Sequence, residues 1–72
     1  MRIRDMREDH DYTQAFVAKY LNIQQNTYSQ YENGKRQLPI DMLIRLADLY
    51  GTSTDYLLGR TNNPAPVKDL PY

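Results

Sequence analysis

Apolar residues recur at helical spacing between positions 13 and 21 of the chain. Val17, Ala18 and Leu21 fall on one side when the segment is wound at about 100° per residue, which is typical of an amphipathic helix. Thr13 stands just before them, and threonine is a preferred helix N-cap. Asn22 comes next after Leu21 and is one of the few non-glycine residues that tolerate a left-handed backbone. The pattern therefore predicts a short helix that ends in a tight turn.

A second helix is predicted from residue 24 to residue 33, with Gly34 as its stop. Tyr28 and Tyr31 point to one side of it, toward a core. The opposite side, within about 140° of arc, carries amides and a hydroxyl but no charge. We call this set the amide face: Gln25, Asn26, Ser29, Gln30 and Asn33. Amides can both donate and accept at the edges of bases, so the face favours nucleic-acid reading over the alternative of an uncharged solvated helix.

Two further helices flank this pair. Ile3 and Met6 at helical spacing among charged residues predict a helix over residues 2–9. Pro39 suits the start of a longer helix, because its φ is preset for a first turn, and Gly51 ends it. A broad apolar stripe along this helix is assigned to the core: Ile40, Leu43, Ile44, Leu46, Ala47 and Tyr50.

A last short helix begins at residue 53 or 54 and ends at Leu58, before Gly59. Either Leu57 or Leu58 seals the core, and the other is exposed. The predicted fold is therefore all-α, a compact bundle of five helices. The helices fill one domain over residues 1–60 of the 72-residue chain.

Residues 61–72 are predicted to form an extended or disordered tail, because they hold three of the four prolines and little apolar content. Val67, Leu70 and Tyr72 of this tail are candidates for packing against a neighbouring subunit.

The order of these features resembles the lambda-repressor/Cro-like helix-turn-helix family, also called the XRE family, over about residues 2 to 60. The residues that carry the resemblance are Thr13-Gln14, Ala18, Ile23, Tyr31-Glu32-Asn33-Gly34 and Asp55-Tyr56-Leu57-Leu58-Gly59. Each match is weak alone, but the complete set in order is specific. Two residues depart from the family pattern: Phe16 stands where Glu often completes a capping box, and Gln24 where Ser or Thr often caps the second motif helix.

The resemblance implies a role for several residues. Base contacts fall on Gln25, Asn26, Ser29 and Gln30, and phosphate contacts on Gln14, Asn33, Lys35 and Arg36. Arg7 and Glu32 are implied to form a partly buried ion pair that ties the first helix to the second motif helix. The family also suggests a dimer interface around Tyr56, Leu57, Leu58 and Arg60.

Charge is the one feature that argues against a nucleic-acid partner, because nine basic and nine acidic residues cancel. The distribution of the charged residues along the chain weakens this argument. Residues 13–39 carry three basic residues against one acidic residue, a net +2, whereas residues 40–59 carry one against three, a net −2. We expect weak non-specific DNA binding with a modest dependence on salt.

Several classes of protein are excluded or disfavoured. The absence of Cys excludes a disulfide framework and a thiolate metal site and fits a cytoplasmic location. The charged N-terminus and the lack of a long apolar run predict neither a signal peptide nor a membrane span. His10, the single histidine, is assigned to a helix end. We therefore expect no metal, no cofactor and no enzymatic activity.

The sequence is interpreted as a DNA-binding transcriptional regulator, most simply a repressor, that acts as a homodimer on a palindromic operator in double-stranded DNA. The alternative is a protein-interaction module, such as an antitoxin or an accessory subunit whose DNA binding depends on a protein partner. That alternative would use Phe16 and the tail, although Phe16 is equally explained by local packing.

Overall fold

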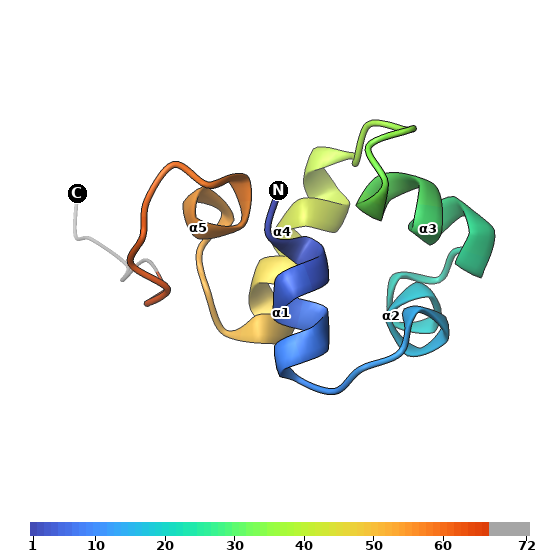
Figure 1. Cartoon of the computed structure of the whole chain (residues 1–72), viewed down its shortest axis with the longest axis horizontal. Coiled ribbons are helices and arrows are strands. Elements are labelled where there is room, and N and C mark those ends of the chain that lie inside the picture. The colour runs from blue at the N-terminus through green and yellow to red at the C-terminus, as the bar shows by residue number, and fades with distance from the viewer. Residues whose placement is uncertain (67–72) are drawn as a thin grey trace.

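A computed structural model of the chain describes residues 1–66. It contains five helices and, within these residues, no strand, which confirms the predicted all-α class. The helices are α1 (Ile3–Asp9), α2 (Gln14–Leu21), α3 (Gln25–Glu32), α4 (Ile40–Tyr50) and α5 (Thr54–Leu58). α1 and α4 occupy the middle of the molecule, with α2 and α3 on one side and α5 on the other (Figure 1).

Local signals in the sequence set the geometry of the α2–turn–α3 unit. The Thr13 hydroxyl accepts a hydrogen bond from the Phe16 N–H at 3.0 Å, which satisfies one free donor of the first turn of α2. Asn22 adopts the predicted left-handed conformation, with φ 60° and ψ 44°. The N–H of Ile23 then returns to the Ala18 carbonyl at 3.0 Å, so α2 ends in a closed turn. Both predictions are confirmed.

α4 fixes the end of α2 from the other side. The Arg45 guanidinium donates to the carbonyls of Tyr20 and Leu21, the latter at 3.3 Å, and both belong to the last turn of α2. The Tyr20 hydroxyl returns a hydrogen bond to the Arg45 carbonyl at 3.1 Å. Charged donors satisfy helix-end carbonyls strongly, so this exchange holds the motif against α4.

The core gathers the inward faces of all five helices. Its buried apolar residues are Ile3, Val17, Ala18, Leu21, Tyr28, Tyr31, Leu38, Leu43, Leu46, Ala47, Tyr50 and Leu57. Leu57 is wholly buried and Leu58 is 43% exposed, which resolves the predicted choice between the two leucines.

The assignment of Ile40 and Ile44 to the core is wrong. Ile40 is 76% exposed and Ile44 is 49% exposed. The buried residues of α4 span only about 100° of arc, and Ile44 lies outside it by helical geometry. Ile40 is the first residue of the helix, before α4 has made a turn against the core. The predicted stripe was therefore broader than the surface that the other helices cover.

The segment after α5 returns to the N-terminus. Arg2 donates from Nη1 to the Thr61 carbonyl at 3.1 Å and from Nη2 to Asn62 Oδ1 at 2.8 Å. The Thr52 hydroxyl donates to the Pro64 carbonyl at 2.6 Å. Thr61, Asn62 and Pro64 thus tie the segment to the start of the chain and to the loop before α5. The predicted contacts of Val67, Leu70 and Tyr72 fall outside the described residues. Across residues 1–66, no helix has the length and apolar character needed to cross a membrane.

We expect the two faces of α4 to differ sharply in their contribution to stability. Leu46→Ala removes a wholly buried side chain and should lower the free energy of unfolding by about 2–5 kcal/mol. Ile44→Ala removes a half-exposed side chain and should cost less than about 1 kcal/mol. Urea unfolding of the two variants measures both values. Equal losses would mean that Ile44 is buried in solution.

Candidate nucleic-acid interface

α3 presents the amide face away from the core. Tyr28 and Tyr31 are buried on the opposite side of the helix, as predicted. Gln25 and Asn26 in its first turn are exposed, and Ser29 and Gln30 are partly exposed. The structure therefore brings the four residues with implied base contacts together on one uncharged face of α3.

The start of α2 lies beside this face. A shallow hollow is lined by Gln14 from α2 and by Gln24, Gln25, Asn26 and Ser29 from the start of α3. Gln14 is the first residue of α2, so free backbone N–H groups of that helix end are close to the hollow. The side chain of Gln14 also turns inward, because its Nε2 donates to Glu32 Oε1 at 3.2 Å.

The remaining residues with implied phosphate contacts follow α3. Asn33 is its C-cap, and Lys35 and Arg36 are exposed in the loop after Gly34. Gly34 has a φ of 72°, a left-handed value that costs glycine little and turns the chain away from the helix axis. Lys35 and Arg36 border an open hollow with Gln37 and Met1. Positive charge therefore lies at the C-terminal end of α3 and amides lie along its side.

A buried carboxylate anchors α3 from behind. The Glu32 side chain has no exposed surface and accepts hydrogen bonds from Arg7 Nε at 2.7 Å and Arg7 Nη2 at 3.1 Å. Arg4 Nε approaches Glu32 Oε1 at 3.4 Å, in addition to the contact from Gln14. Arg7 also donates from Nη1 to the Tyr12 carbonyl at 3.0 Å. The implied partners Arg7 and Glu32 thus form a bidentate ion pair. Arg4 and Gln14 complete the set of donors around the Glu32 carboxylate.

These contacts control the protonation of Glu32. Burial by itself raises the pKa of the carboxyl, but the hydrogen bonds from Arg7 and Gln14 and the Arg7 charge outweigh it and lower the pKa to about 2. The buried Tyr28 hydroxyl adds to this lowering. The hydrogen bond to Glu32 in turn raises the pKa of Arg7. The pair is therefore ionised at neutral pH.

The predicted dimer interface needs one correction. Leu57 is wholly buried in the core, so its side chain has no surface to offer a second subunit. Leu58 and Arg60 are exposed, and the partly buried Tyr56 ring is covered by the Arg2 guanidinium at 4.3 Å from its centroid. The spacing of two adjacent leucines could not show which of them faces inward.

Aromatic rings line the junction of α1 and α2. The Tyr12 and Phe16 ring centroids are 4.6 Å apart, and His10 lies 5.1 Å from Tyr50 and 5.6 Å from Tyr12. Phe16 packs locally, yet 46% of it is exposed. His10 is the C-cap of α1, as predicted. Among the described residues, no group of three or more His, Asp or Glu side chains is placed to hold a metal ion.

Comparison with known proteins gives a consistent result. Residues 3–57 match the helix-turn-helix family. The uncharacterized HTH-type transcriptional regulator YobD of Bacillus subtilis is 38% identical over 65 residues, covering 90% of this chain and 58% of that protein. The HTH-type transcriptional regulator ImmR of the same bacterium is 44% identical over 59 residues, covering 82% and 46% respectively.

A third relative, the antitoxin PezA of Streptococcus pneumoniae, is 28% identical over 67 residues, covering 93% of this chain and 42% of that protein. The chain thus spans about half the length of the curated relatives it matches. No solved structure matches it.

We expect the stability of the fold to decrease in acid because of Glu32. The pKa of the carboxyl is about 2 in the folded chain against 4.5 in the unfolded chain, so the unfolded chain binds more protons between these values. The contribution of Glu32 is complete above pH 4.5 and is lost as the pH falls toward 2, with a slope of at most about 1.4 kcal/mol per pH unit.

Urea unfolding between pH 7 and pH 2 measures this slope. Glu32→Gln should remove part of the acid dependence, and the exposed Glu8 offers a matched control, since Glu8→Gln should retain it. If the two variants lost stability in parallel with the wild type as the pH fell, Glu32 would have an ordinary pKa.

Proposed function

Because the chain belongs to the helix-turn-helix family, we propose that it is a sequence-specific regulator of transcription that binds double-stranded DNA. The observation that carries the proposal is the uncharged amide face of α3, which is held outward by a core and an ion pair behind it. The family and the named regulators among its relatives identify the chain as a non-enzymatic domain.

α3 enters the major groove, and α2 lies across the DNA backbone. Gln25 and Asn26 are exposed in the first turn of α3, where recognition helices of this type touch base edges. Their amides pair with adenine, which offers one acceptor and one donor in the major groove. Ser29 and Gln30, one turn further, read the neighbouring bases.

Phosphate contacts fix the register of α3 on the duplex. Gln14 uses the second N–H of its amide, because the first is directed to Glu32. Lys35 and Arg36 neutralise phosphates on the other side of the groove, and Asn33 donates from its amide. Few charges take part, so the salt dependence is modest.

One domain of this size contacts few base pairs. A two-fold dimer on a palindrome increases that number. Leu58, Arg60 and Tyr56 form the subunit contact, at the end of the molecule away from α3 (Figure 1). The two copies of α3 then lie about one helical turn of DNA apart. Occupancy of such a site within a promoter blocks access for other proteins, which makes repression the simplest outcome.

A second candidate is a domain whose DNA binding depends on a protein partner. Two observations favour it: the antitoxin PezA is among the relatives, and Phe16, on the first turn of α2, exposes nearly half of its surface. Under this candidate, a purified partner would change DNA affinity, and Phe16→Ala would abolish that change without altering binding of DNA by the chain alone.

Selection of binding sites from a randomised double-stranded DNA pool, at near-physiological salt, tests the main proposal. We expect enrichment of a palindrome with half-sites about one helical turn apart. Enrichment of single half-sites would argue against the dimer. Recovery of no motif, with weak binding that disappears as salt is raised, would refute sequence-specific reading.

Single substitutions test the separate roles of the base-contacting and the phosphate-contacting residues. Gln25→Ala should cost about 1–3 kcal/mol on the selected site and relax specificity at one base pair. Lys35→Ala should weaken binding to all sequences alike and flatten the salt dependence by about one unit of slope. Titrations on the selected site and on a scrambled duplex, at several salt concentrations, measure both effects. Equal losses on every sequence for both variants would mean that the roles are misassigned.

A further inference from the structure

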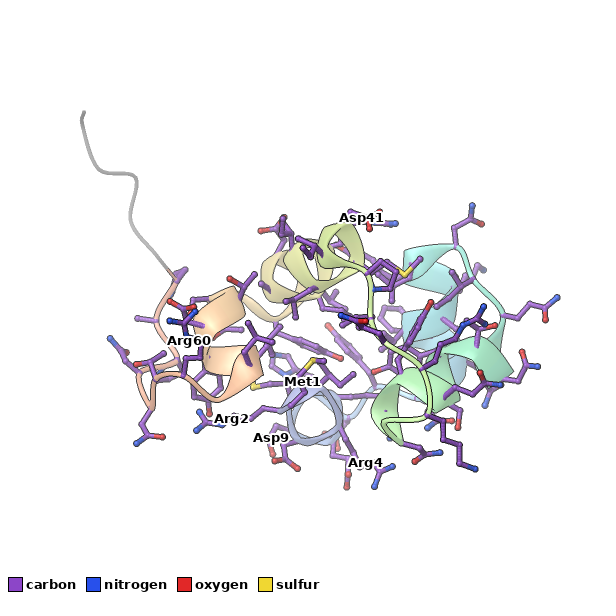
Figure 2. The ribbon with its side chains drawn as sticks, turned by 90° about the horizontal axis from the view of Figure 1, so that it is seen from above. Met1, Arg2, Arg4, Asp9, Asp41 and Arg60 are labelled. Carbon is purple, nitrogen blue, oxygen red and sulfur yellow. The ribbon has the colours of Figure 1, made fainter. Side chains whose placement is uncertain are left out.

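Arg4 joins α1 to the exposed end of α3, and the proposed function gives it no contact with DNA. Its Nη2 donates to Asn33 Oδ1 at 2.6 Å, and its Nε reaches Glu32 Oε1 at 3.4 Å. The side chain is about half exposed, at 49%. Figure 2 shows Arg4 on the side of α1 toward α3, whereas Arg2 lies toward α5. Arg4 is thus the α1 residue that reaches the amide face.

The contact decides which way the Asn33 amide points. A guanidinium has only N–H donors, so the group that faces Arg4 has to be the amide oxygen. The amide nitrogen is then turned to the other side, where Asn33 Nδ2 lies 3.4 Å from Ser29 Oγ. A phosphate oxygen can only accept, so a phosphate contact by Asn33 requires its NH₂ group to be directed outward. The orientation that Arg4 imposes satisfies this requirement.

We propose that Arg4 is a positioning residue for DNA recognition: it holds the Asn33 carbonyl oxygen, so that the Asn33 NH₂ group is directed at Ser29 and at a backbone phosphate. The inference rests on the proposed function. It links α1, through Arg4 and Asn33, to a residue of the amide face that has an implied base contact. Arg4 acts through Asn33 and does not itself touch the DNA.

A direct phosphate contact by Arg4 is the rival explanation, and salt separates the two. Loss of a cation that neutralises a phosphate lowers the slope of log affinity against log salt by about 0.9. Loss of a positioning residue lowers the affinity but leaves that slope unchanged, because Asn33 is neutral and displaces no counterion. The two roles therefore differ in a quantity that general destabilisation of the fold does not change.

The test is a double-mutant cycle with Arg4→Gln and Asn33→Ala on the selected DNA site, at several salt concentrations. Both residues are exposed, so the variants should fold, and thermal unfolding checks this. We expect Arg4→Gln and Asn33→Ala each to weaken binding by about three- to tenfold, the range of one hydrogen bond. The double variant should be no weaker than Asn33→Ala, with an unchanged salt slope. Losses that multiply, or a slope reduced by about one unit, would overturn the proposal.

A second measurement on the free chain keeps the test independent of DNA. In Arg4→Gln, the side-chain amide signals of Asn33 in a ¹⁵N–¹H spectrum should shift, and unchanged signals would overturn the proposal. If the wild-type chain bound no double-stranded sequence, the proposed function would fail and this inference with it. Specific wild-type binding with independent losses would refute the inference alone.

Discussion

The buried carboxylate of Glu32 is the constraint on which the arrangement of the helices depends. Removing a carboxylate from water costs several kcal/mol unless charged donors surround it. Glu32 belongs to α3, Arg7 to α1 and Gln14 to α2, so satisfying one charge fixes three helices relative to one another. Burial of apolar surface supplies most of the stability, but it is non-directional and does not by itself fix how the helices are oriented. The ion pair of Arg7 with Glu32 fixes which side of α3 faces outward.

Much of the fold follows from local signals that act over a few residues. Thr13 as an N-cap and Asn22 as a left-handed stop define α2 wherever the segment is placed. The two faces of α3 follow from helical periodicity in the same way. The exposure of Ile40 and Ile44 could not be predicted, because it depends on how much of α4 the other helices cover. Periodicity gives the phase of an apolar stripe but not its width.

In the candidate site too, some features follow from the local sequence pattern and others only from tertiary contacts. The helical wheel places the amide face, and the family resemblance pairs Arg7 with Glu32. The contacts of Arg4 with Asn33 and of Gln14 with Glu32 join residues that are 29 and 18 positions apart. No spacing rule relates such positions in one sequence. They follow from the placement of α1 and α2 beside α3, which exists only in the folded chain.

The separation of tasks within α3 has a consequence for how the surface can change. Tyr28, Tyr31 and Glu32 anchor the helix, while Gln25 and Asn26 are exposed. Because surface positions away from the core tolerate exchange at little cost in folding free energy, the outward residues are free to vary while the inward ones stay fixed. Duplicated copies of this gene can therefore diverge in ligand preference by a few substitutions at the outward positions of α3. The residues that hold α3 in the fold need not change.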